Sequence, residues 1–217
     1  MILFDLDGTL VDTAPDLGYA LNLQRERHGL TPLAMDVIRP YASHGSKGLL
    51  SIGFNLSPDD DEFESMRAEY LDLYDQVFAR SPVLFDGMAE LLQHLEQQQI
   101  PWGVVTNKPR RFSAPLLKAM QLDTKMACLV CGDDAALPKP APDTLFLACE
   151  QAKVNPAGCF YVGDAERDIE AGNAAGMRTV VALYGYIDAT DQPATWGADY
   201  SISHPNQLVS LIQGLDS

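Results

Sequence analysis

From residue 84 to residue 183, short apolar runs alternate with segments that have helical periodicity, and this alternation limits the possible folds more than any other feature. The apolar runs lie at 102–106, 128–131, 159–163 and 179–183, and a further run, 2–4, opens the chain. Helical patterns lie near 88–99, 110–120, 143–153 and 166–175. Continuous apolar strands separated by amphipathic helices are typical of parallel sheets covered on both faces. The pattern therefore predicts an α/β fold, a Rossmann-like parallel sheet with helices on both faces.

The stretch from residue 13 to residue 83 interrupts the alternation. It contains a helical pattern at 15–28 and a clearer one at 59–79, where apolar side chains recur at three- and four-residue steps. Ser57 and Pro58 precede the second pattern, and the acidic stretch 59–62 suits the first turn of a helix. A chain of 217 residues has room for one core domain and a smaller one. We therefore predict a core from residues 1–12 and 84–217, and an inserted all-helical cap at 13–83.

The charge balance limits the possible partners. The chain has 30 acidic and 15 basic residues, a net charge of −15, and such a field repels nucleic acid and anionic lipid. The sequence also lacks an apolar run of the roughly 18 residues that a membrane span needs. We expect neither nucleic acid nor membrane as a partner. An anionic substrate would need a local positive group or a bound cation.

Four cysteines bear on metal binding and on location. Cys128 and Cys131 have the spacing of a zinc half-site, but no second pair of ligands follows at a comparable spacing. The segment around them has the pattern of a buried strand, so we expect the thiols to pack in the core. Free thiols and the lack of a basic, apolar leader favour a cytoplasmic protein.

Four short motifs lie at the ends of predicted strands or in the loops beyond them. They are Asp5-Leu6-Asp7-Gly8-Thr9-Leu10-Val11-Asp12-Thr13, Thr106-Asn107-Lys108-Pro109, Pro138-Lys139-Pro140-Ala141-Pro142-Asp143 and Gly163-Asp164-Ala165-Glu166-Arg167-Asp168. In open parallel sheets, ligands bind beyond the carboxyl ends of the strands. All four motifs can therefore converge on one site.

Together, and over nearly the whole chain, these motifs resemble the haloacid dehalogenase-like hydrolases, most of which are phosphatases that form an aspartyl-phosphate. The resemblance implies that Asp5 is the nucleophile and Asp7 the general acid and base. Dehalogenases of this superfamily lack an aspartate at the position of Asp7, so carbon–halogen chemistry is not expected. The simpler alternative for Asp5 is an ordinary turn aspartate at the end of a strand, which the company of Asp7, Gly8 and Thr9 disfavours.

The second and third motifs supply the expected phosphate ligands. The resemblance implies that Thr106 and Asn107 hydrogen-bond the phosphoryl group, and that Lys139 neutralises the phosphate and the nucleophile. Thr106 and Asn107 could also cap the helix that follows Pro109. Prolines on both sides stiffen the chain at Lys139. For Lys108, a solvated surface position is at least as compatible with the sequence as a place in the site.

The fourth motif predicts a cation site. Asp164 and Asp168 lie four residues apart, and two carboxylates that face the same way repel unless a cation lies between them. Oxygen ligands suit Mg²⁺. The resemblance implies ligation by the Asp5 side chain, the Asp7 main-chain carbonyl and Asp164, with Asp168 acting through water or holding Lys139. An acidic helix N-terminus is the simpler alternative.

Within the predicted cap, residues 43–48 form the most loop-like stretch. Its hydroxyls, glycines and single lysine could contact a carboxylate or a sugar, so Ser43 and Lys47 are candidate substrate-binding residues. A polar turn between two cap helices explains the same residues without a role in binding.

The resemblance implies a Mg²⁺-dependent phosphomonoester hydrolase that acts on a small phosphorylated metabolite, as a monomer or homodimer. Within the superfamily, the chain is similar to the phosphoglycolate phosphatase group. A narrower resemblance, to the N-acetylmuramic acid 6-phosphate phosphatases of cell-wall recycling, depends on residues 102–109, 184–187 and 196–199. Sugar phosphomutases share the four motifs and stay a less favoured alternative.

Overall fold

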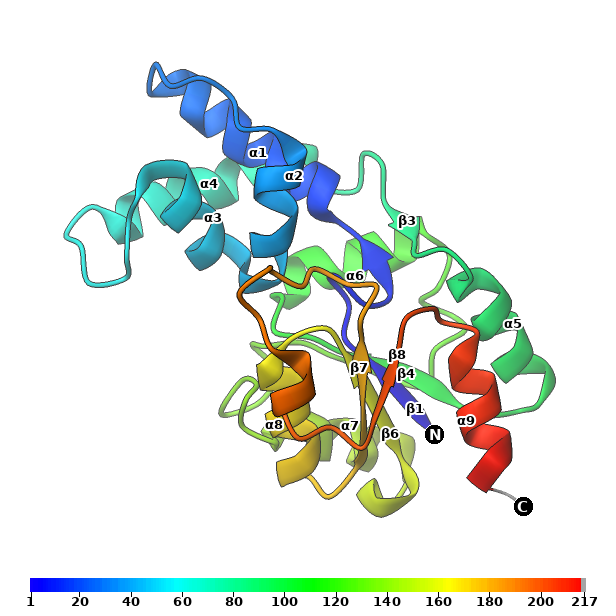
Figure 1. Ribbon diagram of the computed structural model, residues 1–217. Helices are drawn as coiled ribbons and strands as arrows, with labels where there is room; N and C mark the ends of the chain where they lie inside the picture. Colours follow the sequence, from blue (N-terminus) through cyan, green and yellow to red (C-terminus); the bar gives the residue numbers. More distant parts are fainter. Residues whose placement is uncertain (216–217) are drawn as a thin grey trace. The chain divides into compact units, whose positions relative to one another are not determined.

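The core of the protein is a six-stranded sheet with the strand order β5-β4-β1-β6-β7-β8, seen here in a computed structural model that describes residues 1–215 (Figure 1). Every hydrogen-bonded pair of neighbours in this sheet is parallel. The strands are β1 (Ile2–Phe4), β4 (Trp102–Val105), β5 (Leu129–Val130), β6 (Phe160–Gly163), β7 (Arg178–Ala182) and β8 (Tyr200–Ile202). Parallel neighbours cannot be joined by a tight hairpin, so longer connections must link them.

Most of these connections are helical. The connecting helices are α5 (Met88–Gln97), α6 (Arg110–Ala119), α7 (Asp143–Ala152) and α8 (Glu166–Ala174), with short 3₁₀ turns η2 (Pro156–Gly158) and η3 (Pro193–Thr195), and α9 (Gln207–Leu215) follows the last strand. Figure 1 shows α7 and α8 on one side of the sheet and α5 and α9 on the other. The predicted Rossmann-like α/β fold is confirmed.

The apolar side chains under α7 and α8 form one buried cluster. Leu3, Val105 and Tyr161 contribute to it from the three central strands, while Leu145 and Ala171 contribute from the two helices. Because alternate residues of a strand point to opposite faces, Leu3 faces this cluster while its neighbours Ile2 and Phe4 are buried on the other face. The three-residue strand β1 is therefore enclosed on both faces.

All four cysteines are free and buried, in line with their expected place in the core. Cys128, Cys149 and Cys159 belong to the cluster under α7 and α8. Burial raises the pKa of Cys131 to about 12 and that of Cys128 to about 11. Thiols with such pKa values are almost entirely protonated at neutral pH and behave as small apolar side chains.

The chain divides into two compact units, one made of residues 1–11 and 84–217 and the other of residues 12–83. The second unit is helical, with α1 (Ala14–Arg27), α2 (Met35–Ile38), the 3₁₀ helix η1 (Arg39–His44), α3 (Gly45–Phe54) and α4 (Phe63–Val77). Helix α1 packs against α3 and α4, and the buried side chains of Leu21, Leu50 and Tyr70 belong to these three helices. A separate two-stranded sheet pairs β2 (Val11–Asp12) with β3 (Val83–Leu84).

Two local predictions in the helical unit are wrong. Helix α4 begins at Phe63, so the acidic stretch 59–62 precedes it. Asp60 explains the difference, because its carboxylate accepts a hydrogen bond from Ser57 N at 2.6 Å and so favours a turn. Residues 43–48 are not a loop either, because η1 runs to His44 and α3 starts at Gly45. Gly45 has a φ of +59°, which lets the chain change direction between two helices with no loop between them.

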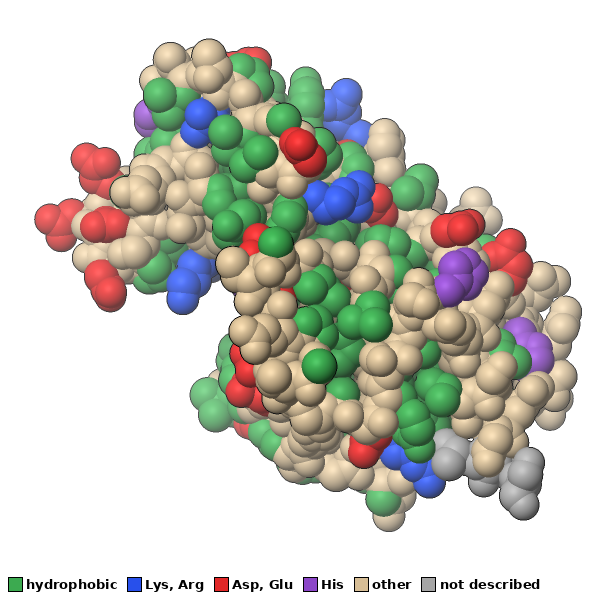
Figure 2. Space-filling view, in the orientation of Figure 1, with side chains coloured by type: hydrophobic (Ala, Val, Ile, Leu, Met, Phe, Trp, Pro, Cys, Tyr) green, Lys and Arg blue, Asp and Glu red, His purple; other side chains and the backbone are tan. Residues whose placement is uncertain are grey.

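The surface shows where some of the acidic residues of the chain gather. Figure 2 shows acidic side chains gathered at the loop between α3 and α4, where Asp59, Asp60, Asp61 and Glu62 are all exposed. Within residues 1–215, no helix has the length and apolar character that crossing a bilayer requires.

Candidate active site

The order of the strands places three of the four motifs side by side. Strand β1 lies between β4 and β6, and Asp5, Thr106 and Asp164 each directly follow one of these strands. In a parallel sheet the carboxyl ends of neighbouring strands lie at the same edge. The three residues therefore share one edge of the sheet.

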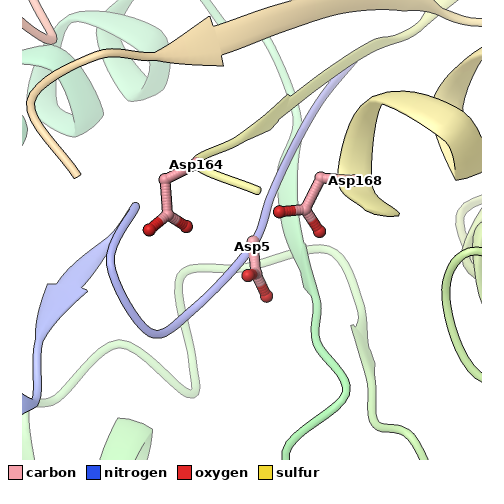
Figure 3. Close-up of side chains that lie close together, drawn as sticks. All are labelled: Asp5, Asp164 and Asp168. Atoms are coloured by element: carbon pink, nitrogen blue, oxygen red, sulfur yellow. The ribbon is translucent and has the colours of Figure 1, made fainter. Parts of the chain in front are cut away.

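Three carboxylates converge at this edge. Asp5, Asp164 and Asp168 come from the end of β1, the end of β6 and the first turn of α8, and Figure 3 shows their side chains close together. One carboxylate oxygen from each lies within 4.8 Å of the others. The three residues are 3%, 1% and 0% exposed. A buried group of negative charges needs cations nearby to offset the cost of desolvation and repulsion.

Lys139 supplies one such cation. Its Nζ lies 2.9 Å from Asp5 Oδ1 and 2.7 Å from Asp168 Oδ1. The ammonium also donates to the Tyr161 hydroxyl at 2.7 Å and to the Val105 carbonyl at 3.2 Å. The lysine side chain is fully buried, so these partners replace its water. Lys139 is thus fixed between the first and fourth motifs.

The two carboxylates beside Lys139 differ in their ionisation. Burial has the largest effect on Asp5 and raises its pKa, and the nearby Lys139 offsets only part of this rise. Burial also acts most strongly on Asp168, but Lys139 and Arg167 outweigh it and hold the pKa of Asp168 below its usual value. Asp168 therefore carries the stable negative charge that pairs with Lys139. Asp5 would gain most from a further cation.

Asp164 is held by the chain on several sides. Thr9 Oγ1 donates to its Oδ1 at 3.0 Å, and the Tyr186 backbone N–H donates to its Oδ2 at 2.9 Å. Gly8 has a φ of +87°, and a Cβ there would lie 2.1 Å from Asp164 Oδ2. A Cβ at Gly185 would lie 2.3 Å from the Asp164 Cβ. Glycine at these two positions lets the backbone approach the carboxylate closely.

The side chains of the second motif hydrogen-bond to backbone atoms of the second and third motifs. The Asn107 amide donates to the Lys139 carbonyl at 2.8 Å and accepts from the Lys139 N–H at 2.9 Å. The side chain thus fixes the third motif against the second. The Thr106 hydroxyl is buried and accepts from Lys108 N at 3.1 Å. Direct contact of Thr106 and Asn107 with a phosphoryl group stays a prediction.

Lys108 is buried, and the possibility of a solvated surface lysine is wrong. Its side chain is 6% exposed, and its Nζ lies 3.0 Å and 3.3 Å from the two carboxylate oxygens of Asp7. Sequence reasoning left this residue open and missed Tyr161 and Arg167. The place of Lys108 inside a motif was the available signal, whereas Tyr161 looks in the sequence like any apolar strand residue.

The two candidate substrate residues of the helical unit lie on consecutive helices. Ser43 is half-buried in η1, and Lys47 is exposed in the first turn of α3. Their role in substrate binding stays a prediction.

The acidic group fits a hard divalent cation. Three carboxylates offer oxygen ligands within a span that one ion can bridge, which is the donor set that Mg²⁺ prefers. Asp5 Oδ1 is buried and takes part in no hydrogen bond with the described residues, although the Lys139 ammonium is near. A carboxylate with a raised pKa and an unsatisfied oxygen gains from a cation.

Comparison with known proteins gives one family and two groups of named relatives. The family model described as haloacid dehalogenase-like hydrolase matches residues 2–182. An N-acetylmuramic acid 6-phosphate phosphatase of Pseudomonas putida is 42% identical over 97% of this chain and 95% of its own length. A phosphoglycolate phosphatase of Xanthomonas campestris pv. campestris is 40% identical over 95% of this chain and 93% of its own.

The solved structures agree with this result. The crystal structure of a predicted phosphoglycolate phosphatase from Haemophilus somnus superposes with a TM-score of 0.83 at 25% identity, and the match covers 98% of this chain and 97% of the other. An assumed haloacid dehalogenase-like hydrolase of Bacteroides fragilis gives a TM-score of 0.82 at 29% identity, over 95% of this chain and 98% of the other.

Proposed function

The chain belongs to the haloacid dehalogenase-like hydrolase family, and from this premise we propose that it is a Mg²⁺-dependent phosphatase that cleaves small phosphate monoesters through an aspartyl-phosphate on Asp5. One observation carries the proposal. Asp5 stands at the end of the central strand, buried between the Lys139 ammonium and the carboxylate of Asp164. A carboxylate in this position can attack a phosphorus atom, while the lysine offsets the charge of the incoming phosphate.

The proposed reaction has two displacements. In the first, an Asp5 oxygen attacks phosphorus, the ester P–O bond breaks, and Asp7 gives a proton to the leaving alkoxide. In the second, Asp7 takes a proton from water, the water oxygen attacks phosphorus, and the acyl-phosphate bond breaks to release inorganic phosphate and the Asp5 carboxylate. Lys139 holds its position through both steps because Asp168 and Tyr161 anchor it.

The proposed metal ligands are the Asp5 carboxylate, the Asp7 main-chain carbonyl and the Asp164 carboxylate. Thr9 and the Tyr186 N–H orient Asp164 for this role. Asp168 uses one oxygen for Lys139 and the other for the Ala165 N–H, which supports a role in holding Lys139. A bound Mg²⁺ would neutralise charge on the phosphoryl oxygens and bring them close to Asp5.

The names of the relatives supply two candidate substrates. N-Acetylmuramic acid 6-phosphate is the first ester to test, because identity is higher with the relatives named for it, and phosphoglycolate is the second. Both esters carry a carboxylate as well as a phosphate. The free thiols suit a reducing compartment, which supports a cytoplasmic location.

The experiment is a panel of phosphate esters incubated with the protein and Mg²⁺, with inorganic phosphate as the readout. We expect phosphate release that stops with chelator and returns with Mg²⁺. Asp5→Asn should lose several orders of magnitude in kcat, whereas Asp123→Asn, at an exposed position of the same unit, should keep it. Full activity in chelated protein contradicts the metal assignment. Isomerised sugar phosphate without phosphate release would instead indicate a mutase.

A further inference from the structure

We propose that Lys108 is a positioning residue that aims the carboxylate of Asp7 for its proton transfers. This inference rests on the proposed function, because it assigns Lys108 a task in the reaction given there to Asp7. The inference depends on one contact: the buried Lys108 ammonium lies 3.0 Å and 3.3 Å from the two carboxylate oxygens of Asp7.

The backbone at Lys108 is anchored on both sides of its side chain. Its N–H donates to Thr106 Oγ1 at 3.1 Å, and its carbonyl accepts from Ser113 Oγ at 3.3 Å. The same carbonyl accepts from Gly132 N at 3.4 Å. A Cβ at Gly132 would lie 2.4 Å from the Asn107 carbonyl oxygen, so the two loops touch through backbone atoms. The backbone at Lys108 is therefore held in place, and this limits the positions that its ammonium can take.

The burial of both partners gives the contact its strength. The Lys108 side chain is 6% exposed and that of Asp7 is 16% exposed. Removing an ammonium from water costs free energy that only a close, hydrogen-bonded anion offsets, so the pair persists instead of exchanging with solvent. Exposed pairs on this surface, such as Arg67 with Glu64, lack that constraint.

Lys108 and Lys139 have separate tasks. The Lys139 ammonium is surrounded by Asp5, Asp168, Tyr161 and the Val105 carbonyl. It is therefore committed to the nucleophile and the fourth motif, while Lys108 contacts the acid and base. General acid–base catalysis depends on a carboxylate that is held within hydrogen-bond reach of the proton that it moves. A lysine that holds both oxygens of Asp7 limits the rotation of that carboxylate.

The test is a double-mutant cycle of Lys108→Met and Asp7→Asn, with kcat and KM measured on an alkyl phosphate that the unmodified enzyme hydrolyses. We expect Lys108→Met to lower kcat about 10- to 100-fold with KM changed less than about threefold, because general acid–base catalysis contributes roughly 10²–10⁴-fold. In the Asp7→Asn background the same change should cost less than about threefold, since the residue that it positions is gone. Lys118→Met, at an exposed site on the following helix, is the matched control.

Two further measurements separate a positioning role from a structural one. With p-nitrophenyl phosphate, whose leaving group needs little protonation, the loss from Lys108→Met should be smaller than with the alkyl ester. Lys108→Arg keeps a cation and should recover part of the lost kcat; should Lys108→Met fail to fold, Lys108→Gln takes its place in the cycle. Circular dichroism and the melting temperature check folding.

Equal losses in both backgrounds, or a rise in KM with kcat unchanged, would overturn the inference and make Lys108 a residue that acts apart from Asp7. These outcomes leave the proposed function intact, because the unmodified enzyme still releases phosphate. If the unmodified protein releases no phosphate from any ester of the panel, the proposed function fails and the role of Lys108 fails with it.

Discussion

At the scale of single residues, the buried Lys139 ammonium connects Asp5, the proposed nucleophile, to the rest of the core. Its contact with Tyr161 extends the hydrogen-bonded site into the interior of β6, because that hydroxyl donates in turn to the Val105 carbonyl at 2.9 Å. Burial raises the pKa of Tyr161 well above its usual value, so the phenol stays neutral and can accept from the lysine while donating to the carbonyl. The tyrosine therefore links β4, β6 and the third motif.

We predict that Tyr161→Phe lowers kcat/KM about 10- to 100-fold and lowers the melting temperature by a few degrees. The variant keeps the ring but leaves the Lys139 ammonium and the Val105 carbonyl each short of one partner, and a lost hydrogen bond to a charged group is worth about 1.5–3 kcal/mol. Steady-state kinetics and thermal unfolding measure both effects. Tyr200→Phe on β8 is the control and should change neither value; unchanged kinetics for Tyr161→Phe would show that Lys139 is fixed without the hydroxyl.

At the scale of elements, the sequence predicts the central strands and the helices around them, because these have strong apolar periodicity. The ends of α7 and α8 differ from the prediction by one residue, and β4 ends one residue early. The prediction misses β8, where the apolar pattern is short and broken by polar residues. It also fails at the start of α4 and at residues 43–48, where a side-chain turn and a glycine with positive φ decide the structure.

The cysteines are buried in or next to these strands and helices, and their burial leads to a prediction about the reactivity of the thiols. Burial raises the pKa of Cys128 to about 11 and those of Cys131 and Cys149 to about 12. Only the thiolate is alkylated, so at pH 8 about one thiol in a thousand or fewer is reactive at these positions. Iodoacetamide should therefore modify the folded protein at least about 100-fold more slowly than the protein in urea, as mass spectrometry can measure. Equal rates in the two states would show that the folded cluster opens freely.

For the site, sequence reasoning named Asp5, Lys139, Asp164 and Asp168, and the structure brings these four together. It could do so because each belongs to a motif and because parallel strands end at one edge. It gave no reason to select Tyr161, whose partners are 22 and 56 residues away in sequence, at Lys139 and Val105. It also gives no reason to expect that the Asn107 amide holds the Lys139 backbone, while direct contact of Asn107 with a phosphoryl group stays a prediction. Contacts between side chains distant in sequence depend on packing, which a single sequence does not reveal.

At the scale of the whole molecule, the net charge of −15 works against the proposed substrates. A phosphate ester that also carries a carboxylate is repelled by this field, although salt screens the repulsion over about 10 Å at 0.1 M ionic strength. Lys108 and Lys139 are each engaged by a carboxylate of the core unit. The substrate carboxylate therefore needs another cation of the chain to bind it. Such a cation would contribute much of the discrimination among phosphate esters.

Lys47 is our candidate for that cation, and we predict that Lys47→Ala raises KM for N-acetylmuramic acid 6-phosphate or phosphoglycolate about 10- to 100-fold. A lost charge-assisted contact is worth about 1.5–3 kcal/mol, which corresponds to this factor. KM for p-nitrophenyl phosphate, which lacks the carboxylate, should change less than about threefold, and Lys118→Ala should change neither. Equal weakening of all esters would assign Lys47 to the phosphate or to folding. On the unmodified enzyme, a preference of tenfold or more in kcat/KM, about 1.4 kcal/mol, decides between the two natural esters.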